Sequence, residues 1–196
     1  MKSIQKPPTT LKRLPPTNVG GGYSLTSIKQ DADFQVSSLA GSKANNSEEL
    51  IARHYNNNEV KLGLSLAKRL AKLSRHKDGS LALIALGHYK LDEYDKAAKW
   101  AEKALRLNPM NSLGNEVFAR LLYKKGRYNE SISRCKIVLK RNPNNMGTMS
   151  LKAANFSKLH DYKEAVVIYQ RLLSLNPNNA EYLFNLMICA VAINDS

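Results

Sequence analysis

Apolar and small residues recur along this chain with a fixed period, and the dipeptide Asn-Pro marks that period. Asn-Pro occurs at Asn108-Pro109, Asn142-Pro143 and Asn176-Pro177, and successive copies are 34 residues apart. Proline cannot continue a helix, and it biases the residue before it away from the helical conformation, so each dipeptide marks a helix end. A fixed period of this length predicts an array of stacked structural repeats.

Small residues fall into two columns when the sequence is aligned on these prolines. The alignment defines three repeats, 78–111, 112–145 and 146–179. The eighth position reads Ala85, Ala119 and Ala153, and the twentieth reads Ala97, Ser131 and Ala165. We expect two helices in each repeat to approach closely at these points. The fifteenth position reads Asp92, Gly126 and His160, which are residue types enriched at positive φ, and it predicts a turn between the two helices.

These columns resemble the tetratricopeptide repeat family, whose 34-residue unit carries small residues at positions 8 and 20 and proline at 32. The resemblance implies an all-α fold, a right-handed α-α superhelix built from helix pairs. Residues 44–77 fit the same frame as a degenerate N-terminal repeat that lacks the closing proline, and residues 180–193 fit a C-terminal helix. We therefore expect nine helices in a repeat domain spanning 44–196.

The first 43 residues have a different composition. They contain Pro7-Pro8, Pro15-Pro16 and three consecutive glycines, with many Ser, Thr and Lys. This composition predicts a disordered basic tail over residues 1–43. The tail could act as a tether, as a proline-rich ligand, or as an autoinhibitor that folds back into its own groove. It has no apolar run typical of a signal peptide, and we expect a cytoplasmic protein.

Positive charge is the second strong signal in the composition. The chain has 30 Lys and Arg against 16 Asp and Glu, a net charge of +14. This balance favours acidic partners. The leading hypothesis is a protein-protein interaction module, acting as an adaptor, scaffold or assembly factor. The alternative is a basic binder of nucleic acid or of an anionic membrane surface, or a subunit of a larger secretion or pilus-type assembly.

No residue pattern indicates catalysis, a metal site or a cofactor. Cys135 and Cys189 have no CxxC or Cys/His spacing around them, and the four histidines fit neither a metal cluster nor a catalytic motif. No glycine-rich phosphate loop follows a strand. We therefore expect a protein that is not an enzyme and needs no cofactor.

In the family that the chain resembles, the first helix of each pair lines a concave groove. We expect tyrosines and lysines to line this groove, with Glu116 and Arg120 on the same surface. The candidate partner-binding residues are Tyr55, Tyr89, Lys90, Glu116, Arg120, Tyr123, Lys124 and Lys158. Tyrosine beside lysine suits a peptide that carries apolar and acidic side chains. The alternative is that these tyrosines are buried for packing alone.

One ligand class is disfavoured by the same frame. Family members that clamp a C-terminal carboxylate use Lys, Asn and Arg at positions that read Ala82, Leu86, Val117, Gly147 and Leu151 here. The clamp for chaperone tails is therefore not expected.

The last predicted helix is apolar on nearly every side. Terminal repeats need a polar outer face to stay soluble, so this helix could carry an interface. We take Phe184, Ile188 and Val191 as the candidate interface for self-association or for docking of a partner. A simple end helix that hides its apolar surface on the preceding pair is the alternative.

Overall fold

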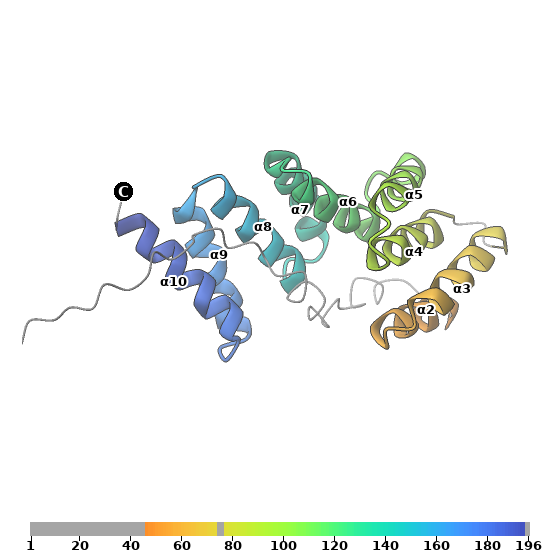
Figure 1. Cartoon of the computed structure of the whole chain (residues 1–196), viewed down its shortest axis with the longest axis horizontal. Helices are drawn as coiled ribbons and strands as arrows, with labels where there is room; N and C mark the ends of the chain where they lie inside the picture. The colour runs from red at the N-terminus through yellow and green to blue at the C-terminus, as the bar shows by residue number, and fades with distance from the viewer. Residues whose placement is uncertain (1–45, 74–76, 195–196) are drawn as a thin grey trace, which may run out of the picture. The chain divides into compact units, whose positions relative to one another are not determined.

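The structure is a computed structural model that describes residues 46–73 and 77–194, and these residues form nine α-helices and no strand (Figure 1). The helices are α2 (Asn46–Asn56), α3 (Val60–Leu73), α4 (Lys77–Lys90), α5 (Tyr94–Leu107), α6 (Ser112–Lys124), α7 (Tyr128–Arg141), α8 (Met146–Lys158), α9 (Tyr162–Leu175) and α10 (Ala180–Asn194). The predicted all-α fold is confirmed. The predicted tail, residues 1–43, lies outside the described residues.

Consecutive helices pack on each other along the chain. Helices α2 and α3, α4 and α5, α6 and α7, and α8 and α9 form pairs, and α10 packs on α9 (Figure 1). The first helices of neighbouring pairs also meet, since α4 packs on α6 and α6 on α8. None of the described helices has both the length and the apolar character needed to span a membrane.

Each pair turns at one residue with positive φ. These residues are Asn58, Asp92, Gly126 and His160, with φ angles of 63°, 59°, 73° and 60°. They occupy the fifteenth position of the four units, so the turn predicted from this column is confirmed. The second helix begins two residues later in every case.

The Asn-Pro segments end one helix and start the next. Helices α5, α7 and α9 end directly before the three dipeptides. The Asn at the last position of each repeat caps the following helix, because its side-chain oxygen accepts a hydrogen bond from a first-turn backbone N–H. The donor–acceptor distances are 2.7 Å from Gly114 to Asn111, 2.9 Å from Thr148 to Asn145, and 3.0 Å from Tyr182 to Asn179.

Side chains from neighbouring elements tie some of these loops in place. The Asp78 carboxylate accepts hydrogen bonds from the side-chain amides of Asn108 and Asn111, both at 2.9 Å. Burial alone would raise the pKa of Asp78, but these bonds hold it below its ordinary value. Arg141 donates to the Met110 carbonyl at 3.0 Å, and Arg171 donates to the Pro143 carbonyl at 3.2 Å.

The small-residue columns form the core of the pairs. All six residues, Ala85, Ala97, Ala119, Ser131, Ala153 and Ala165, have no exposed surface. Ser131 also carries polar contacts, since its hydroxyl donates to the Ala119 carbonyl at 2.8 Å and accepts from the Asn155 amide at 3.0 Å. The close approach predicted at these positions is confirmed, and at Ser131 it links three helices.

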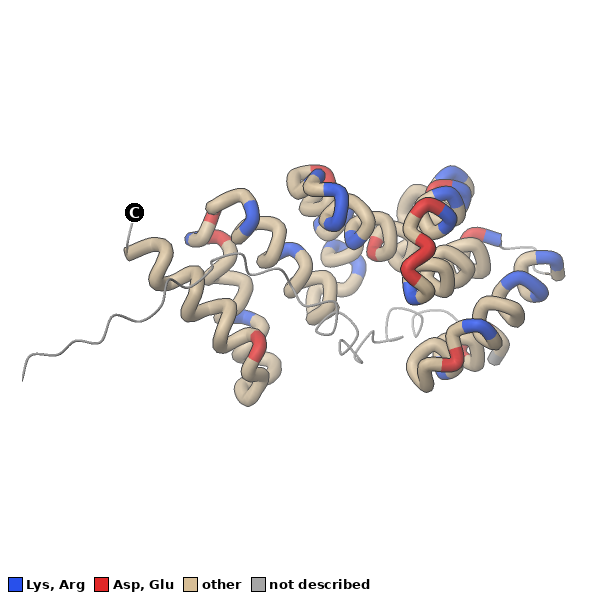
Figure 2. The backbone as a smooth tube through the Cα atoms, in the orientation of Figure 1, with Lys and Arg blue, Asp and Glu red and all other residues tan. Residues whose placement is uncertain are grey.

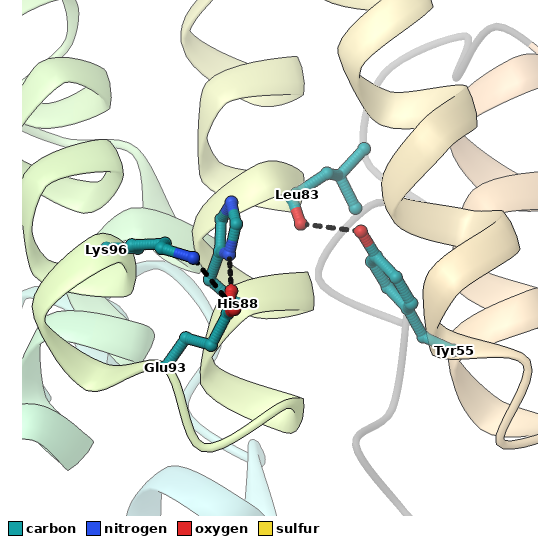
Figure 3. Close-up of polar contacts among 5 residues, drawn as sticks. All are labelled: Tyr55, Leu83, His88, Glu93 and Lys96. Atoms are coloured by element: carbon teal, nitrogen blue, oxygen red, sulfur yellow. Dashed lines mark hydrogen bonds and ion pairs between the residues drawn. The ribbon is translucent and has the colours of Figure 1, made fainter.

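In the first pair, a buried tyrosine packs against glycines on two other helices. Tyr55 is buried, and its hydroxyl donates to the Leu83 carbonyl of α4 at 2.9 Å (Figure 3). A Cβ atom at Gly63 would lie 2.6 Å from the tyrosine ring, and one at Gly87 would lie 2.5 Å from its hydroxyl oxygen. The ring therefore needs glycine on both neighbouring helices.

Gly87→Ala is expected to lower the free energy of unfolding by about 1–3 kcal/mol, the usual cost of overpacking. The new methyl group would collide with the Tyr55 hydroxyl. Urea denaturation of the single variants and of the Gly87→Ala/Tyr55→Phe double variant measures the coupling. Because Tyr55→Phe removes the colliding oxygen, Gly87→Ala should cost less in that background. Equal costs in the two backgrounds would show that the hydroxyl does not need the glycine.

Candidate partner-binding site

The tyrosines of the predicted groove lie mostly in the core. Tyr55 is 1% exposed, Tyr89 is 9% exposed, and Tyr123 is half-buried. The Tyr89 ring packs against Tyr94 with centroids 5.7 Å apart, and the Tyr123 ring packs against Tyr128 at 5.6 Å. In these two repeats the tyrosine near the end of the first helix thus packs on the tyrosine that begins the second. The prediction that Tyr55 and Tyr89 are open anchors is wrong, because both side chains are buried in the core.

Glu116 and Arg120 are also buried, at 4% and 6% exposure. They form an ion pair on α6, with the Arg120 Nη2 atom 3.2 Å from the Glu116 Oε1 atom. The first turn of α8 covers the pair, since a Cβ atom at Gly147 would lie 3.3 Å from Arg120 Nη2. The prediction that this pair lies open on the groove is wrong, because the neighbouring repeat closes over it.

Three lysines of the prediction remain at the surface. Lys90, Lys124 and Lys158 are the last residues of α4, α6 and α8, and we call them the lysine row. Lys90 and Lys124 are partly exposed, and Lys158 is exposed. The Lys124 ammonium lies 4.6 Å from the centroid of the Tyr94 ring, a cation–π contact with the preceding repeat. The row is the part of the predicted site that can meet a partner.

The surroundings of Lys90 disfavour the charged form of its side chain. Partial burial lowers the pKa of its ammonium group, and the positive charge of Arg120 lowers it further. An anionic side chain placed beside Lys90 would relieve both effects, because it would stabilise the charged ammonium.

The turn beside Lys90 is held by a polar cluster that the sequence analysis did not identify. His88 and Lys96 both pair with the Glu93 carboxylate, the lysine at 2.8 Å (Figure 3). Hydrogen bonds from Lys96 and His88 lower the pKa of Glu93. His54 and Glu59 repeat the pairing one unit earlier, at 2.5 Å. The recurrence of His and Glu at the eleventh and sixteenth positions of two units is the sequence pattern from which this pairing could have been predicted.

A concave feature lies between α5, α6 and α7. It is an open groove of about 540 Å³ lined by Glu102, Leu105, Arg106, Pro109, Phe118 and Arg134. Its lining carries both signs of charge, and Arg134 already packs over the Phe118 ring at 5.3 Å. Because both signs of charge line this groove, it does not favour one kind of ligand. The lysine row, in contrast, carries only positive charge.

Neither cysteine is placed for chemistry. Cys135 and Cys189 are buried, and burial raises the pKa of the Cys135 thiol to about 12. Within residues 46–73 and 77–194, no three His, Cys, Asp or Glu side chains are grouped so that they could hold a metal ion.

The fold and the surface together define a class of protein, an all-α array of helix pairs that presents one row of charged residues from its first helices. The family model of the anaphase-promoting complex, cyclosome, subunit 3, matches residues 92–172. This match covers less than half of the chain, and together with the structural neighbours described next it shows that the chain has a tetratricopeptide-repeat fold. Among curated protein sequences, no significant match was found.

Solved structures of similar fold include three kinds of repeat protein. MamA residues 41 to the end from Desulfovibrio magneticus RS-1 is 18% identical with a TM-score of 0.63, covering 79% of this chain and 88% of that one. The first repeat domain of Spaghetti (RPAP3), bound to the HSP90 peptide SRMEEVD, is 23% identical with a TM-score of 0.57, covering 62% and 96%. The Arabidopsis OM64 repeat domain is 18% identical with a TM-score of 0.54, covering 57% and 93%. At these identities the likeness is one of fold.

Glu116→Gln is expected to destabilise the protein by about 3–5 kcal/mol, because it leaves the buried Arg120 charge without its carboxylate. The double variant Glu116→Leu/Arg120→Leu should lose less, since it removes both charges. Chemical denaturation of the single and double variants gives the coupling free energy. Additive losses would contradict a direct interaction between these two side chains.

Lys90→Met is expected to raise the free energy of unfolding at neutral pH, because it removes a charge that burial and Arg120 disfavour. A lysine whose pKa is lowered by folding binds fewer protons in the folded state than in the unfolded state. The free energy of unfolding of the native protein therefore rises as the pH increases from the folded pKa to about 10.4, the ordinary lysine value. The advantage of the variant should therefore shrink toward pH 10.5 or so. Urea denaturation across this range, with Lys158→Met as the control for loss of one exposed lysine, tests the effect. A constant difference across the pH range would contradict it.

Proposed function

We propose that this protein is a non-enzymatic interaction module, an adaptor, scaffold or assembly factor, that binds a segment of another protein along the lysine row. One observation carries the proposal. The same repeat position holds a lysine in three successive repeats, at the ends of first helices that pack on one another. Recurring exposed charge at one register position gives a linear pattern that an extended segment can follow. The cytosolic location expected from the sequence stays a prediction.

The chemistry of the row favours a partner that combines acidic and apolar side chains. Among the described residues, none of the three lysines forms an ion pair, so their charge is available to a ligand. The partly exposed rings of Tyr94 and Tyr123 supply apolar surface beside them. Each ammonium offers three hydrogen-bond donors and no acceptor, which suits carboxylates.

The comparisons support a peptide ligand in general terms. The repeat domain of RPAP3 is described as bound to an HSP90 peptide whose sequence, SRMEEVD, is acidic. In this chain the positions that clamp such a C-terminal carboxylate hold Ala82, Leu86, Val117, Gly147 and Leu151. We therefore propose an acidic segment that is recognised by side-chain charge along the row.

A matched pair of triple variants tests this site. Lys90→Ala/Lys124→Ala/Lys158→Ala removes the row, and Lys99→Ala/Lys103→Ala/Lys136→Ala removes the same charge from α5 and α7. The probe is an array of short peptides that combine Asp or Glu with Leu or Phe, followed by fluorescence anisotropy on the tightest binder. We expect the row variant to bind at least about 10-fold more weakly, a loss of about 1.4 kcal/mol or more, while the control variant keeps its affinity.

Two results would contradict the proposal. Equal weakening in both variants would show attraction by net charge alone. Absence of binding to any peptide of the array would remove the acidic segment as the ligand. Circular dichroism of both variants checks that the helices remain, since all six substituted lysines lie at or near the surface.

A further inference from the structure

Helix α10 presents an apolar face that no described helix covers. Five large side chains on it are exposed: Leu183 at 47%, Phe184 at 60%, Met187 at 64%, Ile188 at 40% and Val191 at 57%. We call these residues the α10 face. On the other side of the helix, Tyr182 and Cys189 are buried in the core shared with α8 and α9. Contiguous exposed apolar surface of this kind marks interaction sites on soluble proteins.

The repeat register shows that the α10 face is a helix-packing surface. Its residues stand at the fourth, fifth, eighth, ninth and twelfth positions of the repeat. At the same positions α8 carries Met149, Ser150, Ala153, Ala154 and Ser157, of which the first four are buried and the last is half-buried. In α8, Met149 and Ala153 share a core with α9 and α10, and the Ser157 hydroxyl oxygen lies 3.2 Å from the Cys189 sulfur of α10. The α10 face therefore continues an interface that the preceding repeat fills with helices.

The eighth position distinguishes α10 from the three first helices that directly precede it. Helices α4, α6 and α8 have alanine there, which lets the second helix of the pair approach closely. Helix α10 has Met187, a long flexible side chain that would hold a neighbouring helix further away. Phe184, Met187, Ile188 and Val191 instead recur at the spacing of an apolar seam between two helices that dock side by side.

Charge indicates which occupant fits this seam. Among the described helices, α10 alone contains no Lys or Arg, and Figure 2 draws it in tan along most of its length. The whole chain carries +14, so two copies repel each other wherever lysine-bearing helices meet. The α10 face is the surface where two copies can touch without bringing lysines together. An acidic partner, in contrast, finds no cation there to bind.

We propose that two copies of this chain associate through the α10 face, with the two α10 helices antiparallel about a two-fold axis between Met187 and Ile188. In this arrangement Phe184 lies opposite Val191 of the second copy, and Met187 lies opposite Ile188 of the second copy, so large residues meet smaller ones. Glu181 lies opposite Asn194 of the second copy. A parallel arrangement would place the two Glu181 residues together. Antiparallel packing also aligns the two helix dipoles favourably.

Sedimentation velocity of the full chain over a concentration series tests the association. The monomer mass is 21.9 kDa, and we expect the weight-average mass to rise toward twice this value. Met187→Lys should abolish the rise, because it places one cation from each copy beside the axis, inside the apolar seam. Val167→Lys is the matched control, since Val167 is 62% exposed on α9 away from the seam, and it should leave the association unchanged. Circular dichroism confirms that both variants are folded.

Two outcomes would overturn the proposal. One is a native chain that stays monomeric at every concentration, and the other is a Met187→Lys variant that still dimerises. The lysine-row triple variant should dimerise like the native chain, so the test is independent of the proposed partner binding.

Disulfide trapping tests the antiparallel geometry. The variants Phe184→Cys and Val191→Cys are made separately, mixed, and oxidised gently. Antiparallel packing predicts a covalent dimer that joins one copy of each variant, and little dimer from either variant alone. Phe184→Cys dimers that form without the second variant would overturn the antiparallel arrangement. The native cysteines do not compete, because Cys135 and Cys189 are buried.

Discussion

The repeat array depends on the close contact that one small, fully buried residue on each helix allows within a pair. Ala85 and Ala97, Ala119 and Ser131, and Ala153 and Ala165 fill these positions without any exposed surface. Because the helices lie this close, the positive-φ residue between them must reverse the chain within a few residues. The capping asparagines then start the first helix of the next pair. In the first pair Gly63 is the small residue at the twentieth position, and Gly63 and Gly87 leave space for the Tyr55 ring.

The same packing decides which polar residues remain available for binding. Side chains along the middle of α6 are covered by the next repeat, which is why Glu116 and Arg120 form a buried pair and contribute little to an outer surface. The ends of the first helices extend past this cover, and the lysine row lies there. Lys124 also rests on the Tyr94 ring, so the core aromatic pairs support the charged surface directly.

Most of the fold could be predicted from the sequence, because its determinants are local. Proline, a residue that tolerates positive φ, and a small side chain each act at one position, and each recurs every 34 residues. Burial of Tyr89, Glu116 and Arg120 could not be read in this way, since it depends on which surface the neighbouring repeat covers. The ring pair of Tyr89 and Tyr94 and the approach of Gly147 to Arg120 arise only after the helices pack. The α10 face, in contrast, was visible as an apolar helix with few polar residues.

The side-chain ties to the Asn-Pro loops also vary along the chain. Asp78 and Arg141 hold the first loop, Arg171 holds the second, and in the described residues the third loop, at Asn176-Pro177, has no comparable tie to another repeat. In a linear array the stability of each unit is set by its own folding and by contact with its neighbours. The third loop therefore has fewer side-chain hydrogen bonds to oppose local opening than the first two loops have.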